Sequence, residues 1–139
     1  MKRFFKVSCV CFLLILSSIF LSACNKQVTV EFVRFYIGQR QTDYYLDFTL
    51  KINNPTGNTV IIDNSDFYVK VNDEEFYSVA FLYENEETFY AAVNVESNGH
   101  LTLRARVVTA NLKNKDRNYI AIKYKDSLIV EDNIYVSKS

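Results

Sequence analysis

Cysteine thiols are the most reactive groups that this sequence offers, and its three cysteines are unevenly placed. Cys9 and Cys11 lie within an uncharged stretch near the start, and Cys24 follows that stretch directly. If the stretch is removed, Cys24 alone remains, and a single cysteine cannot form a disulfide within the chain. An odd cysteine in an exported protein needs another explanation, and covalent modification of the thiol supplies one.

Histidine and carboxylate side chains offer the other candidate chemistry. His100 is the only histidine and begins a predicted strand, and no Gly-x-Ser-x-Gly elbow accompanies it. A hydrolase that uses His100 or loop carboxylates is therefore the weakest alternative. The acidic runs Asp73-Glu74-Glu75 and Glu84, Glu86, Glu87 lack the spacing of a calcium loop, so we expect solvated hairpin tips. Three glycines cannot build a phosphate-binding loop. We predict a non-enzymatic protein with no metal or other cofactor.

Aromatic side chains are the remaining candidates for recognition. The chain has ten Tyr, eleven Phe and no Trp. If residues 76–83 form one strand, Tyr77 and Tyr83 share one face of it. Exposed tyrosines are good contact residues, because they offer a large area and a hydroxyl group. Tyr77, Tyr83 and Tyr90 are therefore predicted partner contacts, although such rings more often fill the core or cover sheet edges.

The start of the chain has the features of an export signal. Lys2, Arg3 and Lys6 precede an uncharged stretch whose apolar centre, residues 10–21, is too short to span a bilayer as a helix. Leu21-Ser22-Ala23-Cys24 then resembles the lipobox of bacterial lipoproteins. The resemblance implies that signal peptidase recognises Leu21, Ser22 and Ala23, that residues 1–23 are removed, and that Cys24 carries a diacylglyceryl lipid. An uncleaved anchor helix is the alternative.

The sequence pattern after the predicted signal indicates β-strands. Apolar and polar residues alternate most clearly in residues 44–53, 66–72, 100–108 and 120–124, which is typical of half-buried antiparallel strands. On this pattern Asp47, Thr49 and Lys51 lie opposite the apolar face of one strand, and Thr102, Arg104 and Arg106 lie opposite that of another. Further strands are predicted at 28–37, 59–62, 76–83, 88–95 and 128–136. Turns are predicted at 54–58, 63–66, 71–75 and 97–99, and 110–117 is the best place for a single helical turn. Eight or nine such strands predict one all-β, immunoglobulin-like antiparallel β-sandwich over residues 28–139.

The order of these features is similar to the telokin-like immunoglobulin-fold domain of many small bacterial lipoproteins. The resemblance rests on Asn53-Asn54-Pro55, on Ser65-Asp66-Phe67, on Ser97-Asn98-Gly99 before residues 101–107, and on the late strand 119–124. The turn at Asn98-Gly99-His100 departs from the family, which often has Pro-Gly-Gly there. Because the family has largely unassigned functions, the resemblance implies a fold and little chemistry.

The net charge and the short segment between Cys24 and the first predicted strand limit the partners that the protein could bind. Without residues 1–23 the chain has 13 basic and 16 acidic residues, which does not favour nucleic-acid binding or general adhesion to anionic lipid. Residues 24–27 leave a lipidated tether of about 13 Å, so the domain would lie close to the bilayer. We predict a lipid-anchored extracytoplasmic binding module of the cell membrane, most simply for a protein partner. A superinfection-exclusion lipoprotein of a mobile element and a small-ligand or glycan carrier are alternatives.

Overall fold

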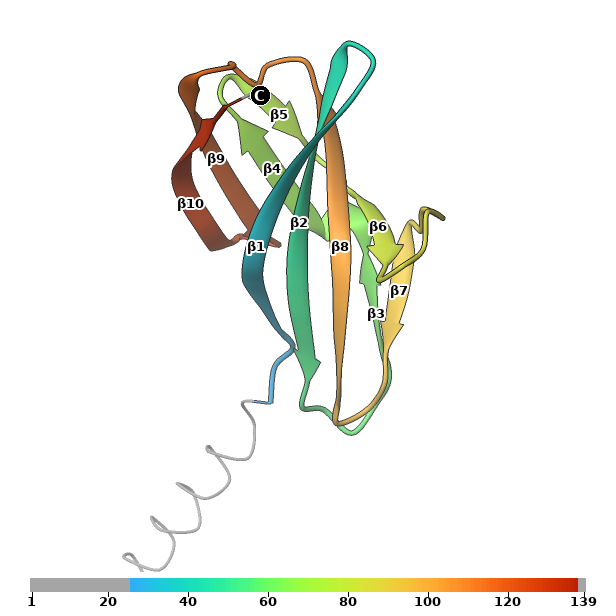
Figure 1. Ribbon diagram of the computed structural model, residues 1–139. Coiled ribbons are helices and arrows are strands. Elements are labelled where there is room, and N and C mark those ends of the chain that lie inside the picture. Colours follow the sequence, from blue (N-terminus) through green and yellow to red (C-terminus); the bar gives the residue numbers. More distant parts are fainter. Residues whose placement is uncertain (1–25, 138–139) are drawn as a thin grey trace, which may run out of the picture.

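Strands dominate the part of the chain that the computed structural model describes, residues 26–137 (Figure 1). The predicted leader, residues 1–23, and Cys24 lie outside the described residues. The single helical element within them is a 3-10 turn, η1 (Asn64–Asp66). None of the helices described is long and apolar enough for a membrane span. The strands in chain order are β1 (Thr29–Arg40), β2 (Asp43–Asn54), β3 (Val60–Asp63), β4 (Phe67–Val71), β5 (Glu74–Phe76), β6 (Ala80–Tyr83), β7 (Ala92–Val95), β8 (Gly99–Thr109), β9 (Asp116–Tyr124) and β10 (Ser127–Val136).

The strands form two four-stranded sheets that pack face to face (Figure 1). The first sheet has the order β1-β2-β8-β6 and the second the order β10-β9-β4-β5, and β3 pairs with β7 in a separate ribbon. Neighbouring strands are antiparallel throughout. The predicted all-β antiparallel sandwich is confirmed, with ten strands in the described region instead of eight or nine.

The core lies between the sheets and follows the predicted alternation. The inward residues of β2 are fully buried, and they face the buried residues of β4 and β9. Phe67 of β4 meets Phe81 of β6 edge to face, with ring centroids 5.5 Å apart, which joins the two sheets. The fully buried side chains between the two sheets include Leu46, Phe48, Leu50, Ile52, Val69, Val71, Phe81, Leu103, Ala105, Ile120 and Ile122.

Two predicted strands are wrong in extent. Residues 76–83 do not form one strand: β5 ends at Phe76 in the second sheet, and β6 begins at Ala80 in the first. The chain crosses from one sheet to the other over residues 77–79, and the Val79 side chain in this crossing is buried in the core. Of residues 88–95 only β7 is a strand, and Tyr90 makes an isolated bridge to Phe81. The alternation rule does not indicate where a chain changes sheet.

Side-chain amides hold the loops where the sequence offers few signals. The helical turn predicted at 110–117 is absent. Asn118, which is buried, donates instead to the carbonyls of Lys113 and Asp116 and accepts from the Lys113 N–H. At the other end, Asn54 donates to the carbonyls of Val95 and Glu96 and thereby fixes the predicted turn after β2. Buried amides satisfied in this way stabilise loops that have no regular hydrogen-bond ladder.

Candidate functional site

The outer face of the first sheet, which points away from the core, carries a row of charged and aromatic side chains. The strand register places Tyr36 of β1 beside Asp47 of β2, and Asp47 beside Arg106 of β8. The adjacent row joins Arg34, Thr49 and Arg104 in the same way. Residues paired across an antiparallel sheet point to one face, so the register alone gathers these side chains.

A β-bulge in β1 determines which residues of that strand reach the outer face. The β1–β2 register shifts between Phe32 and Arg34, with Val33 as the extra residue. Phe32 and Phe35 consequently both turn inward, with ring centroids 4.4 Å apart. Arg34 and Tyr36 turn outward, and the Tyr36 side chain is 60% exposed. Bulges often re-aim side chains in this way next to functional sites.

Asp47 is the centre of the face. It is only 1% exposed, and its two carboxylate oxygens accept from Arg106 Nε at 2.6 Å and Arg106 Nη2 at 2.8 Å. Arg104 Nη1 lies 3.5 Å from the second oxygen. The hydrogen bonds to Asp47 raise the pKa of Arg106. This two-point geometry fixes the plane of the guanidinium, so Arg106 is held in place before any ligand arrives.

The Tyr45 ring packs between a glycine and this arginine. The Arg106 guanidinium lies 4.1 Å from the centroid of the Tyr45 ring, a cation–π contact, and 5.7 Å from that of Phe89. A β-carbon at Gly38 would lie 1.8 Å from Tyr45 Cζ. Gly38 is therefore required by the close approach of the ring, and its own φ is not in the left-handed region. The glycine, the ring and the arginine form one stack across three elements.

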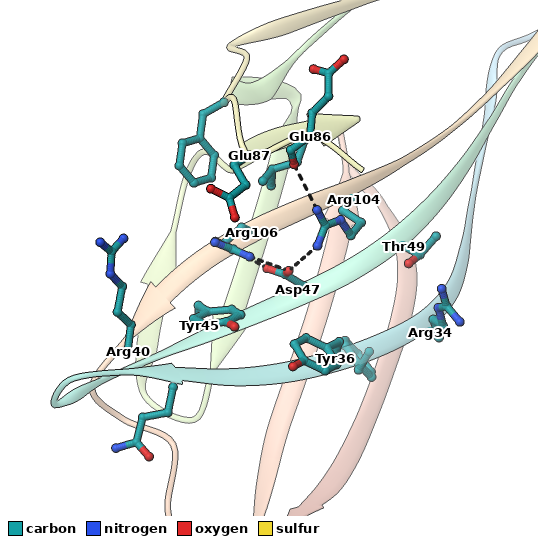
Figure 2. A pocket seen from close by; sticks show the side chains of 14 residues that line it. Arg34, Tyr36, Arg40, Tyr45, Asp47, Thr49, Glu86, Glu87, Arg104 and Arg106 are labelled. Atoms are coloured by element: carbon teal, nitrogen blue, oxygen red, sulfur yellow. Dashed lines mark hydrogen bonds and ion pairs between the residues drawn. The ribbon is translucent and has the colours of Figure 1, made fainter. Parts of the chain in front are cut away.

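Glu86, Glu87 and Phe89, in the loop that follows β6, form one wall of a groove of about 940 Å³ on this face (Figure 2). The carbonyl of Glu86 accepts from Arg104 Nη2 at 3.2 Å, and the Glu86 carboxylate accepts from the Tyr90 hydroxyl at 2.9 Å. Figure 2 shows Glu86 and Glu87 above the sheet and the Asp47 cluster on its floor. We call this region the arginine groove; its lining residues include Arg34, Tyr36, Arg40, Tyr45, Asp47, Glu86, Glu87, Phe89, Arg104 and Arg106.

Arg34 and Arg40 differ from the two central arginines. Both are exposed residues of β1, and neither guanidinium makes a hydrogen bond or an ion pair with the rest of residues 26–137. Asp43 is the register partner of Arg40, yet the two form no ion pair. Figure 2 shows Arg34 and Arg40 at separate ends of the groove. The groove thus has a fixed centre and two free positive charges on its rim.

The predicted contact tyrosines do not form one face. Tyr77, which is 68% exposed, lies on the outer side of the second sheet, where its hydroxyl donates to Glu75. Tyr83 belongs to β6 of the first sheet and packs edge to face on Tyr90, with centroids 5.0 Å apart. The prediction that Tyr77 and Tyr83 share a strand face is wrong, because the chain changes sheet between them. Tyr83 and Tyr90 are partly buried against the core.

The outer face of the second sheet is covered by tyrosine–glutamate pairs. The Tyr68 hydroxyl donates to Glu75 at 2.6 Å, and the Tyr119 hydroxyl donates to Glu131. The hydrogen bond to Glu75 raises the pKa of Tyr68 to about 12, and the bonds from Tyr68 and Tyr77 lower the pKa of Glu75. On this face the hydroxyls and carboxylates satisfy each other.

The candidate catalytic and metal-binding residues are not brought together. His100 is exposed at the start of β8, and its ring makes no hydrogen bond or ion pair within the described residues. Over residues 26–137 no group of three or more His, Cys, Asp or Glu side chains could hold a metal ion. Glu74 accepts from Thr109, and Glu75 accepts from Tyr68 and Tyr77. These carboxylates therefore serve hydrogen bonds within the fold.

No family model, curated protein or solved structure matches this chain. The lipoprotein and telokin-like resemblances consequently stay predictions.

Sequence reasoning did not identify the groove, although it placed three of its residues correctly as outward-facing. Arg104 and Arg106 are two positions apart in one strand and so share a face, and Asp47 lies on the polar face of an otherwise apolar strand. An Arg-x-Arg pair and a single acid on polar strand faces are the signal that was available. What was missing is the register that places Asp47 opposite Arg106.

Proposed function

We propose that this protein is a non-enzymatic binding module, anchored by a lipid on Cys24 to the outer face of the cytoplasmic membrane, whose recognition surface for a protein partner is the arginine groove. The observation that carries the proposal is the Asp47–Arg106 pair at the centre of the groove. A carboxylate that is almost fully buried holds the guanidinium in one orientation against the Tyr45 ring. Arranging a recognition side chain before binding lowers the entropic cost of complex formation.

The composition of the groove also supports recognition of a protein. Arginine and tyrosine are enriched among the residues that dominate binding energies at protein interfaces. The groove combines both types with the exposed ring of Phe89. Its centre is satisfied internally, so it holds its shape in the free protein, while its rim still offers unpaired charge.

The proposed anchor leaves the groove accessible. β1 begins at Thr29, five residues after Cys24, which is at most about 17 Å of extended chain. From Thr29 the strand runs to Arg40, a further rise of about 36 Å at 3.3 Å per residue. If Cys24 is lipidated, the Arg40 end of the groove is the end farther from the membrane. A partner could reach that end without displacing the domain.

A small-ligand or glycan carrier is the second candidate function, and the size of the groove favours it. Ligand sites commonly measure about 300–1,000 Å³, and a volume of about 940 Å³ falls within that range. A carrier would bind a soluble compound with the same residues but would form no complex with another protein.

Photo-crosslinking in intact cells separates these proposals. A photoreactive residue at Tyr36, on the groove rim, is expected to give one discrete protein adduct. The same residue at Tyr135 of β10 is the control, because the two side chains are 60% and 63% exposed. Adducts from Tyr135 alone, or the same adducts from both positions, would contradict the proposal. Absence of protein adducts at Tyr36 would leave the carrier as the better reading.

The anchor is tested separately. Cys24→Ala should accumulate as an unprocessed precursor that takes up no labelled fatty acid, because the thiol is the proposed acceptor. Normal maturation of this variant would contradict lipidation at Cys24, whatever the crosslinking shows.

A further inference from the structure

We propose that the partner binds through an extended acidic segment that adds to the free edge of β1 and places one carboxylate at Arg34 and another at Arg40. This inference rests on the proposed function and specifies its ligand. It is carried by the spacing of the two rim arginines, the free edge of β1 and the pattern of charge around the groove.

The spacing of the two arginines indicates the length of the ligand. Arg34, Tyr36, Gly38 and Arg40 follow one another on the outer face of β1. Six residues at about 3.3 Å per residue separate Arg34 from Arg40 by about 20 Å. A compact anion can reach only one of them. An extended peptide spans both with seven residues and turns its first, third, fifth and seventh side chains toward this face.

The edge of β1 offers the backbone groups for such pairing. β1 is the terminal strand of the first sheet and pairs only with β2. Within residues 26–137, no backbone hydrogen bond outside that ladder involves a β1 residue. An antiparallel segment on this edge would put its carboxylates directly opposite the two arginines. Strand addition combines main-chain hydrogen bonds with side-chain selectivity in this manner.

Charge disfavours a second copy of this chain as the ligand. An antiparallel pair of β1 strands centred in this region would bring Arg34 close to Arg40 of the other copy. Like charges facing each other across strands are destabilising. The same two charges favour a segment of opposite sign.

Charge also argues against a membrane surface as the ligand. Glu86 and Glu87 line the same groove, and the chain without residues 1–23 has an acidic surplus. Both would repel anionic headgroups. A peptide whose carboxylates are confined to its two ends avoids those glutamates.

Two peptides of identical composition test the inference. In acetyl-Glu-Val-Thr-Val-Thr-Val-Glu-amide, the carboxylates can face Arg34 and Arg40. In acetyl-Val-Glu-Thr-Val-Thr-Glu-Val-amide, the carboxylates are only four residues, about 13 Å, apart, so they cannot face Arg34 and Arg40 together in any register. Fluorescence anisotropy with the full chain in detergent should show saturable binding of the first peptide, at least about tenfold tighter than that of the second. Equal affinities, or no binding of either peptide, would overturn the inference.

Point variants test whether Arg34 and Arg40 are the residues that bind the peptide carboxylates. Arg34→Ala and Arg40→Ala should each weaken binding of the first peptide about tenfold. Arg117→Ala is the matched control, since Arg117 is an exposed arginine on β9 of the second sheet. An equal loss with Arg117→Ala would reduce the effect to net charge and overturn the inference. So would binding of phosphatidylglycerol vesicles that Arg34→Ala abolishes, if the peptides do not bind. In either case a discrete adduct at Tyr36 would leave the proposed function standing.

Discussion

The two sheets differ in how the polar side chains on their outer faces are paired. On the second sheet, tyrosine hydroxyls donate to glutamates beside them, and both partners stay in contact with solvent. On the first sheet, one carboxylate is buried beneath two arginines, and the loop of residues 84–89 rises over them. The second sheet pairs tyrosines with glutamates, whereas the first sheet pairs arginines with an aspartate.

The difference lies in burial and in what is left unpaired. Exposed pairs such as Tyr68–Glu75 add little to stability, because solvent competes for both groups. The buried Asp47 cluster costs desolvation and is stable only while its partners remain. A protein gains rigidity from such a cluster more readily than stability. That rigidity, together with the free charges of Arg34 and Arg40, is why we assign recognition to the first sheet.

The largest expected effect comes from removing Asp47. Asp47→Ala leaves two arginines without a counter-charge, and their side chains are only 22% and 34% exposed. We expect the free energy of unfolding in urea to fall by about 2–3 kcal/mol. Glu75→Ala is the matched removal of a carboxylate from the other face, and we expect no measurable change in the urea midpoint. Similar losses in both variants would remove the contrast between the faces.

A smaller effect is expected from Gly38→Ala. The added methyl group must displace the Tyr45 ring, which should cost about 1–2 kcal/mol and separate the ring from Arg106. Gly57→Ala is the control, because no atom lies within 4 Å of a β-carbon at that position. Thermal unfolding of the two variants tests this expectation. A Gly38→Ala protein as stable as Gly57→Ala would show that the stack is loosely packed.

The second sheet gives the smallest effect, a change in titration. An ordinary tyrosine ionises near pH 10.0, and the hydrogen bond to Glu75 raises the pKa of Tyr68 to about 12. Because the folded-state pKa is the higher one, the stabilisation from this bond is complete below pH 10 and is lost as the pH rises through about 12. Glu75 also raises the pKa of Tyr77, so ultraviolet titration of Glu75→Gln should show two tyrosines that ionise at lower pH than in the unaltered protein. Identical titration curves would rule out this pairing.

The alternation of the sequence was sufficient to predict the sandwich. Leu46, Phe48, Leu50 and Ile52 are buried as that pattern requires, and the predicted hairpin after Val71 is present, with Asn72 at φ 53°. Such patterns are local, because they can be recognised within the sequence of a single strand or turn. The turn at Gln41 also has a positive φ, but it contains no glycine, proline or asparagine, so the sequence did not predict it.

The groove could not be predicted in the same way, because it depends on pairing between distant strands. The Val33 bulge reverses which β1 residues face outward, and the β2–β8 register brings Asp47 to Arg106 across 59 positions of sequence. Neither feature leaves a local pattern. The predicted tyrosines failed as a common face for the same reason, since a change of sheet after Phe76 separates Tyr77 from Tyr83.

Arginine-directed chemical labelling of the unaltered protein tests the recognition surface most directly. Phenylglyoxal would be applied to intact cells and to the purified protein, and modification of Arg34, Arg40 and Arg117 would be quantified by mass spectrometry. If a partner occupies the arginine groove, Arg34 and Arg40 will be protected in cells relative to the purified protein, while Arg117 is modified equally in both. Equal modification of all three arginines in both samples would contradict the assignment of this face to binding.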